Sequence, residues 1–492
     1  MARSPLPSVP SRLLDIEVAD SARRGEPLAA VLTPDGESAY SELAVRVRAT
    51  GKAGEVQLVP GDEGPRWFVG VGDGTEKQYR CAGAAFVRAA SSFAAAEADA
   101  GRRSPKRVAV ALPAEASSEH VAAFATGALL GGYRFTVSSD EPPASVRTVR
   151  LLAAHERAVP EYTGAVDRAR ELAAASALAR DLANAPANVK NPAWLADVAE
   201  RVGGEVPGLS VTVRDEHWLS AQAFGGVLAV GGGSESPPRL IELSHRPRGA
   251  TTHLLLVGKG ITFDTGGISI KPAQGMHLMR TDMSGGGAVI AAMRAIAALR
   301  LGVRVTGLVP AAENHVSGSS YRPGDVVRHY GGRTTEVANT DAEGRMVLAD
   351  AIAYGVQRYR PDAVVDVATL TGAMKVALGL RTGGLFASDD ELAERVLAAG
   401  ERTGEQWWRM PLLADHAEDV RSDIADVRQA PPGPGGITAA LFLREFTADL
   451  PWAHLDIAGP ARSEKNYDEV VPGGTGFSAR TLVELAASYA GR

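Results

Sequence analysis

Cysteine is almost missing from this sequence: Cys81 is the single one among 492 residues. A disulfide framework and a thiolate metal cluster need several cysteines, so both are excluded, and a reducing cytoplasm fits best. Long apolar runs are missing too, because the most apolar stretch, 121–133, is shorter than the roughly 20 residues that span a bilayer. The amino-terminal MARSPLPSVPSRLLDIEVAD carries prolines and early charges where a signal peptide needs an apolar segment. We therefore expect a soluble, cytoplasmic protein with no membrane partner.

An excess of positive charge is also lacking. Lys and Arg total 52 against 58 Asp and Glu, which gives a net charge of -6. This balance offers no general attraction to nucleic acid, although it does not exclude a local basic patch. Apolar material is ample, since 45% of the residues are hydrophobic. Because the chain is too long for one ordinary hydrophobic core, we expect two domains.

The first third of the chain has a strand–helix–strand rhythm. Apolar runs predict strands at 106–113 and 148–155, with a helix at 119–133 between them. The pattern breaks near 160–170, where an alanine-rich helix is predicted at 166–186. We therefore place a small α/β domain, divergent and related to oligomer formation, at 1–165, and a larger catalytic domain at 166–492.

The larger domain alternates strands and helices. Buried strands are predicted at 253–258, 303–309, 363–370 and 453–459, and helices at 288–299 and 346–359. Two short segments, 325–330 and 333–338, flank Gly331-Gly332, which is a hairpin signal. Such alternation predicts a mostly parallel sheet flanked by helices, so the fold class is α/β with two domains.

Acidic residues gather in the connections that follow these strands, where open α/β sheets place their sites. Four acids and two lysines fall within about 85 residues of one another: Lys259, Asp264, Lys271, Asp282, Asp341 and Glu343. Burying four carboxylates together is prohibitive unless cations neutralise them, and two divalent ions would supply that charge. If residues 339–345 are extended, Asp341 and Glu343 point to one centre, and Arg345 lies on the same side.

Each of these residues also has a simpler interpretation. Asp282 lies just before a predicted helix and could be its N-cap. Glu343 could merely favour the first turn of its helix through the helix dipole. Lys259 in a glycine-rich turn resembles a phosphate cradle, but the Walker spacing is absent. Together, however, the acids and lysines favour a two-metal hydrolase.

Four strings in the same region resemble a known family. KGITFDTGGISIK, TDMSGGGA, NTDAEGR and DVATLTGA, in that order, are similar to the leucyl (cytosol) aminopeptidases, the M17 metallopeptidases. The resemblance continues in RDLANAPANVKNP, AVGGGSESPPRL, YRPGD and WAHLDIAG and covers roughly residues 175–490. The first 160 residues show no matching motif.

The resemblance implies a role for each residue of the cluster. Lys259, through a neutral amine, and Asp282 would bind one metal ion, Asp264 and Glu343 would bridge two ions, and Asp341 would complete the second site. The catalytic pair would be Lys271, which stabilises an oxyanion, and Arg345, which holds a bicarbonate that relays a proton. Zinc, manganese and magnesium all suit such ligands. The substrates would be peptides with a free amino terminus, and the assembly a homohexamer.

The resemblance also implies a side-chain pocket and shows two departures. The pocket would be lined by Met279, Thr369, Leu370, Gly372, Ala458 and Ala461. Since family members often carry methionine near position 461, the alanine here predicts a larger pocket that accepts bulky first residues. Ser284 with three glycines and the loop APPGPGG at 430–436 both depart from the family pattern. Two other functions stay open: a DNA-binding hexamer, and a specialised dipeptidase or amidase of the same two-metal type.

Overall fold

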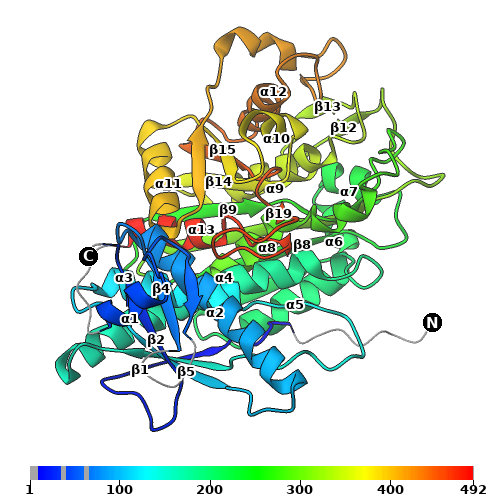
Figure 1. The fold of residues 1–492 in the computed structure, drawn as a ribbon. Helices are drawn as coiled ribbons and strands as arrows, with labels where there is room; N and C mark the ends of the chain where they lie inside the picture. The colour runs from blue at the N-terminus through cyan, green and yellow to red at the C-terminus, as the bar shows by residue number, and fades with distance from the viewer. Residues whose placement is uncertain (1–8, 35–39, 60–65, 491–492) are drawn as a thin grey trace. The chain divides into compact units, whose positions relative to one another are not determined.

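The computed structural model describes residues 9–34, 40–59 and 66–490 (Figure 1). The chain forms two compact units. The first comprises the described residues up to Ala177 together with Glu464–Pro472, and the second comprises Leu178–Ser463 with the chain from Gly473 onward. The predicted domain boundary at 165/166 falls within helix α4 (Val159–Asn184), about 12 residues before the second unit begins.

The first unit contains a six-stranded sheet in the order β1-β6-β5-β2-β4-β3, counted over the described residues. Its strands are β1 Asp15–Ala19, β2 Leu28–Leu32, β3 Val56–Leu58, β4 Trp67–Gly70, β5 Arg107–Ala111 and β6 Thr148–Leu152, and its further helices are α1 Ser41–Arg46, α2 Glu76–Asp99 and α3 Ser118–Gly131. All pairs are parallel except β3 with β4. The strands predicted at 106–113 and 148–155 and the helix predicted between them are confirmed as β5, β6 and α3.

The second unit contains a nine-stranded mixed sheet within the described part of the chain, in the order β16-β15-β18-β14-β9-β11-β8-β7, with β10 paired to β11. Its strands are β7 Leu209–Arg214, β8 Arg239–His245, β9 His253–Gly258, β10 Gly260–Asp264, β11 Arg304–Asn314, β14 Ala363–Ala368, β15 Thr382–Ala387, β16 Gln406–Arg409 and β18 Trp452–Asp456. The central pairs, from β18 through β14 and β9 to β11, are parallel, whereas β7, β8 and the β15–β18 pair are antiparallel.

Helices and two small sheets complete this unit. The helices are α5 Pro192–Gly204, α6 Glu216–Ala221, α7 Gly225–Gly231, α8 Ser284–Ala298, α9 Glu343–Tyr359, α10 Gly372–Leu378, α11 Asp390–Thr403, α12 Gly435–Arg444 and α13 Ala479–Tyr489. The small sheets pair β12 Val326–Arg328 with β13 Thr334–Glu336 and β17 Val427–Arg428, and β19 Arg462–Ser463 with β20 Gly473–Gly474. The predicted hairpin is therefore confirmed, and both glycines of its turn have positive φ. None of the described helices is long and apolar enough to cross a membrane.

The central strands are covered on both faces, as the continuous apolar runs predict. Gly307 of β11 lies against Met293 of α8, while Leu308, the next residue, lies against Gly355 of α9. Because successive side chains of a strand point to opposite faces, α8 and α9 cover opposite faces of the sheet. All six residues of β9 and all six of β14 are buried. This fixed core presents the carboxyl ends of β9, β10, β14 and β18 to one region.

Candidate metal centre

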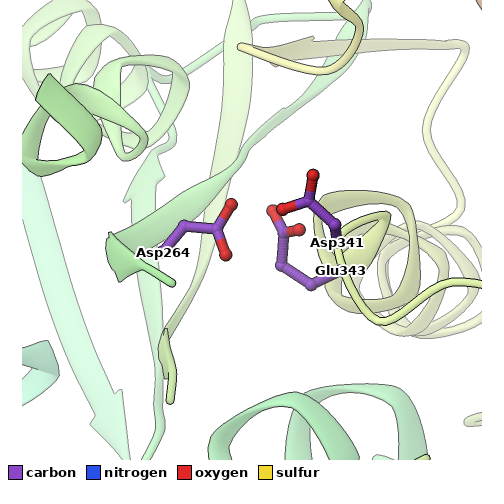
Figure 2. Close-up of side chains that lie close together, drawn as sticks. All are labelled: Asp264, Asp341 and Glu343. Carbon is purple, nitrogen blue, oxygen red and sulfur yellow. The ribbon is translucent and has the colours of Figure 1, made fainter. Parts of the chain in front are cut away.

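The predicted acids meet at the carboxyl ends of these strands. Asp264 is the last residue of β10, and Glu343 is the first residue of α9. Figure 2 shows the Asp264 carboxylate turned toward those of Asp341 and Glu343. Asp341 lies in the loop before α9, and Glu343 lies at the start of that helix. One oxygen from each of the three carboxylates lies within 4.8 Å of the others. Two segments distant in sequence therefore bring three acids to one centre.

The two lysines lie between these acids. Lys259 Nζ is 2.9 Å from Asp282 Oδ2 and 2.7 Å from Glu343 Oε1. Lys271 Nζ is 2.7 Å from Asp264 Oδ2 and also pairs with Asp341 Oδ1. Lys259 further donates a hydrogen bond of 3.1 Å to the carbonyl oxygen of Thr369. All the residues that the sequence assigned to metal binding, together with Lys271, therefore form one connected cluster.

The cluster is highly charged for a buried location. Burial acts to lower the pKa of Lys259, but the carboxylates of Asp282, Glu343 and Asp264 outweigh it and raise the pKa above its ordinary value. The pKa of Lys271 is raised in the same way, since the surrounding acids prevail over burial. With the cluster free of other cations, both lysines are therefore ammonium ions that neutralise part of the acidic charge.

Burial has the opposite consequence for the acids. It raises the pKa of Asp264 to about 6, and nearby Glu343 adds to the effect while Lys271 and Lys259 oppose it. Burial likewise raises the pKa of Asp282 and that of Glu343, in spite of the ammonium group of Lys259. Burial thus disfavours the ionised form of these carboxylates, and a divalent cation beside them would stabilise that form.

Unsatisfied oxygens test whether these residues fit a metal ion. Both carboxylate oxygens of Glu343, Asp341 Oδ1 and Asp282 Oδ2 are buried and accept no hydrogen bond from the described residues. Lysine ammonium groups lie at ion-pair distance from three of these oxygens, Asp282 Oδ2, Glu343 Oε1 and Asp341 Oδ1. Buried polar atoms in native proteins are nearly always satisfied, and oxygen atoms with open lone pairs are what hard divalent cations bind. The residues fit a metal centre.

A second set of residues, which sequence reasoning missed, ties the acid-bearing loops together. Asn314 Nδ2 donates to Asp264 Oδ1 at 2.8 Å and to the carbonyl oxygen of Thr340 at 3.0 Å. The Thr340 hydroxyl donates to the carbonyl oxygen of Gly266 and accepts from the Ser269 amide. Gly266 has φ of 87°, a conformation that glycine adopts without strain. These bonds fix the loop after β10 against the loop before α9.

Arg345 departs from the prediction of an extended segment. Helix α9 begins at Glu343, so residues 339–345 do not stay extended, and that part of the sequence interpretation was wrong. Arg345 is 7% exposed and donates through Nη1 to the carbonyl oxygen of Gln429. Burial lowers its pKa to about 10, although Glu343 and Asp456 act to raise it. The guanidinium remains a buried cation beside the acids.

The N-cap alternative for Asp282 was also wrong. Met283 is the N-cap residue of α8 and makes no side-chain capping bond, while Asp282 Oδ1 accepts a hydrogen bond of 2.7 Å from Thr369 Oγ1. Glu343 does lie in the first turn of α9, but it also pairs with Lys259, so the helix-dipole interpretation alone is insufficient.

Two of the predicted pocket residues bind a buried acid that the sequence did not single out, and a third, Thr369, lies next to one of them in the chain. Asp456 Oδ1 accepts hydrogen bonds from the amides of Leu370 at 3.2 Å and Ala458 at 3.1 Å. Its Oδ2 accepts from the amide and the hydroxyl of Thr371, the N-cap of α10. Thr369, immediately before Leu370, touches both Asp282 and Lys259. Asp456 therefore organises the loop that joins the pocket to the charged cluster.

The other three pocket residues lie on separate segments. Met279 is half-buried in the 3-10 helix Met276–Thr281, which ends just before Asp282. Gly372 is the first residue of α10, with open space where a Cβ would point. Ala461 is 3% exposed and bonds through its amide to the Ile457 carbonyl oxygen.

A buried cluster of carboxylates and lysines at the carboxyl ends of an α/β sheet is typical of metal-dependent hydrolases. The sequence model described as "Cytosol aminopeptidase family, catalytic domain" matches residues 177–483, and the one described as "Cytosol aminopeptidase family, N-terminal domain" matches residues 22–140. The chain therefore belongs to the cytosol aminopeptidase family and is a metal-dependent aminopeptidase. The amino-terminal region, whose sequence shows no motif of the family, therefore also matches a domain of this family, over residues 22–140.

Relatives and solved structures agree with this assignment. A probable cytosol aminopeptidase of Cutibacterium acnes is 44% identical over 460 residues, which cover 92% of this chain and 87% of the relative. One of Syntrophotalea carbinolica is 46% identical over 366 residues, 73% of each chain. Among solved structures, the bottromycin maturation enzyme BotP in complex with Mn is 39% identical, with a TM-score of 0.84 over 95% of this chain and 100% of that one. A tomato leucine aminopeptidase variant is 32% identical, with a TM-score of 0.85 over 99% and 98%.

Proposed function

We propose that this protein removes the amino-terminal residue, leucine and other mainly hydrophobic residues, from peptides, with a water molecule activated by two divalent metal ions. The observation that carries the proposal is the group of Asp264, Asp341 and Glu343 oxygens within 4.8 Å of one another, continued by Lys259 beside Asp282. The five side chains supply enough ligand atoms for two adjacent ions.

Five side chains of this protein would hold the two metal ions between them. Lys259 and Asp282 would hold one ion and Asp341 the other, while Asp264 and Glu343 would contribute to both. Bound there, the ions would lower the pKa of a shared water and take up the substrate's free α-amine. Lys259 would have to lose a proton before its amine could act as a ligand, and the ion's own positive charge would favour that loss.

Two cations remain for the substrate side of the reaction. Lys271, 20% exposed at its side chain, would donate to the oxygen of the attacked carbonyl as negative charge develops on it. Arg345, held by the Gln429 carbonyl oxygen, would bind bicarbonate, whose oxygens would accept the proton of the attacking water.

Substitution of the acids tests this assignment. Glu343→Gln and Asp264→Asn each keep the shape of a ligand but remove a charge, so turnover of leucyl amide should be abolished while circular dichroism stays unchanged. Blocking the substrate's amine by acetylation should abolish turnover by the wild type as well. Near-normal rates in either variant, or cleavage of the blocked substrate, would sink the proposal.

Metal preference and side-chain preference are the finer parts of the proposal. We propose manganese or zinc as the physiological ion, with magnesium also fitting the ligands, and the manganese complex of the similar maturation enzyme supports the first choice. The small, buried Ala461 supports a pocket for bulky or aromatic residues. Metal analysis of protein purified without chelator and a panel of aminoacyl amides test both; strict preference for alanine or glycine would overturn the pocket argument.

A specialised dipeptidase or amidase of the same two-metal type is the second candidate, favoured by the likeness to the bottromycin maturation enzyme. Dipeptides, longer peptides and N-blocked peptides distinguish it from a general aminopeptidase. We further propose a cytoplasmic homohexamer, as in the family resemblance, which sedimentation would test. DNA binding has no support from the net charge of -6, and a salt-dependent gel shift would decide it.

A further inference from the structure

Gln429 lies where a short strand ends beside the loop that carries Asp341. β17 pairs in parallel with β13, with Glu336 opposite Arg428. This ladder continues one step further, because the Gln429 amide donates a hydrogen bond of 3.0 Å to the Glu336 carbonyl oxygen. The side chain of Gln429 is thereby placed at the start of residues 337–342, which connect β13 to α9.

The side-chain amide of Gln429 joins the two ends of this connection. Its Oε1 accepts hydrogen bonds from the backbone amides of Ala338 at 3.2 Å and Asn339 at 3.1 Å. Its Nε2 donates a hydrogen bond of 2.9 Å to the carbonyl oxygen of Ala342, the N-cap residue of α9. Asp341 lies between these points, and Glu343 follows directly.

The backbone carbonyl of the same residue reaches the next functional group. It accepts a hydrogen bond from Nη1 of Arg345, in the first turn of α9. Gln429 is 0% exposed, so none of these bonds competes with water. One residue therefore contacts the segment 336–345 at five places and brackets Asp341, Glu343 and Arg345.

Only an amide side chain can make this set of contacts. Glutamine offers one acceptor and one donor at its end, whereas glutamate has acceptors alone and methionine has no comparable donor or acceptor. The acids that this loop carries repel one another and Asp264 when ionised, so their positions need support from elsewhere. Hydrogen bonds behind metal-binding side chains commonly provide such support.

We infer that Gln429 is a positioning residue of the metal centre: through its side-chain amide it holds the Asp341–Glu343 loop in the geometry that binds divalent cations. The inference rests on the metal site proposed above. The proline- and glycine-rich stretch that departs from the family pattern begins at the next residue, Ala430, so the hydrogen bonds of Gln429 also fix where this stretch begins.

Titration with Mn²⁺ alone tests the inference without reference to activity. Chelator-treated Gln429→Glu and Gln429→Met should bind Mn²⁺ about 10–100-fold more weakly than the wild type in calorimetry, the usual effect of losing such support. Gln357, exposed near the far end of α9, supplies the matched control: Gln357→Met should bind as the wild type does. Circular dichroism of each variant confirms that it is folded.

The outcomes separate the inference from the proposed function. Wild-type Mn²⁺ affinity in both variants overturns the role of Gln429, whatever happens to turnover. If Gln429→Met does not fold, Gln429→Glu, which has the same shape, decides alone. A wild type that binds no Mn²⁺ overturns the proposed metal site itself, and the wild-type titration reveals that failure directly.

Discussion

Gly344 lies between Glu343 and Arg345. One methyl group added there should greatly lower activity while it changes stability only slightly. A Cβ at this position would lie 2.6 Å from Cε of Lys259 and 2.8 Å from its Nζ. Favourable contact between carbon atoms begins at roughly 3.5–4.0 Å, so Lys259 would have to move. Lys259 is 3% exposed and contacts both Glu343 and Asp282, so its displacement would disturb these two contacts.

The expected change in stability is small. Alanine is favoured over glycine in a helix by about 1 kcal/mol, whereas an extra methyl in a packed site costs about 1–3 kcal/mol. The net loss for Gly344→Ala is then about 0–2 kcal/mol, within the roughly 5–15 kcal/mol that holds a domain folded. Displacing a reacting or ligating group by about 1 Å, in contrast, can lower the rate about 100-fold.

We therefore expect Gly344→Ala to fold normally and to lose about 100-fold or more in kcat/KM for leucyl amide at saturating Mn²⁺. Urea unfolding and initial rates measure the two quantities on the same preparation. Gly204, exposed at the end of α5 with open space around its Cβ direction, provides the control: Gly204→Ala should keep wild-type rates. Wild-type turnover by Gly344→Ala would refute the argument from close approach.

Three further predictions concern the pocket loop, a buried histidine and the metal. Asp456→Asn replaces an acceptor by a donor opposite the Leu370 and Thr371 groups, at about 1–3 kcal/mol, so KM for leucyl amide should rise about 10-fold; an unchanged KM contradicts this. Burial, aided by nearby Arg304, lowers the pKa of His253 from 6.5 to about 4, so the unfolded chain binds the proton first and stability falls as pH drops through that range. Between these pH values His253→Gln should lose less unfolding free energy than the wild type. Equal losses in the two proteins, measured by urea unfolding at each pH, would count against this prediction. Chelation should lower the thermal midpoint and abolish turnover, with Mn²⁺ restoring both; a midpoint indifferent to chelator would argue against buried ligands.

The periodic parts of the fold were accessible from sequence because their burial is encoded locally. β9 and β14 are apolar except for His253 and Asp366, since helices cover both faces. Such runs are recognisable without knowledge of their neighbours. The start of α9 was less accessible. Its first turn contains Glu343 and Arg345, whose polarity gives no apolar period, so the helix was predicted to begin three residues late, at Met346.

The charged residues of the site were also accessible, because motifs carry them in fixed spacing. Asn314, Thr340, Gln429 and Asp456 were not, although each is 0% exposed. Their partners are mainly backbone groups of loops that lie far away in sequence. An isolated polar residue gives no pattern from which such a partner can be predicted; a fully buried polar side chain identifies it only once the fold is known.

The short segment Glu464–Pro472 has a consequence for synthesis on the ribosome. It belongs to the first compact unit, where Glu469 pairs with the buried Arg80 of α2 and the Asp468 carbonyl oxygen accepts from Arg88. The ribosome reaches this segment about 290 residues after the rest of that unit, which at roughly 5–20 residues per second is a delay of about 15–60 s. The amino-terminal unit therefore reaches its final form only when translation is almost complete, and a nascent chain stalled before Glu464 holds that unit without its closing segment.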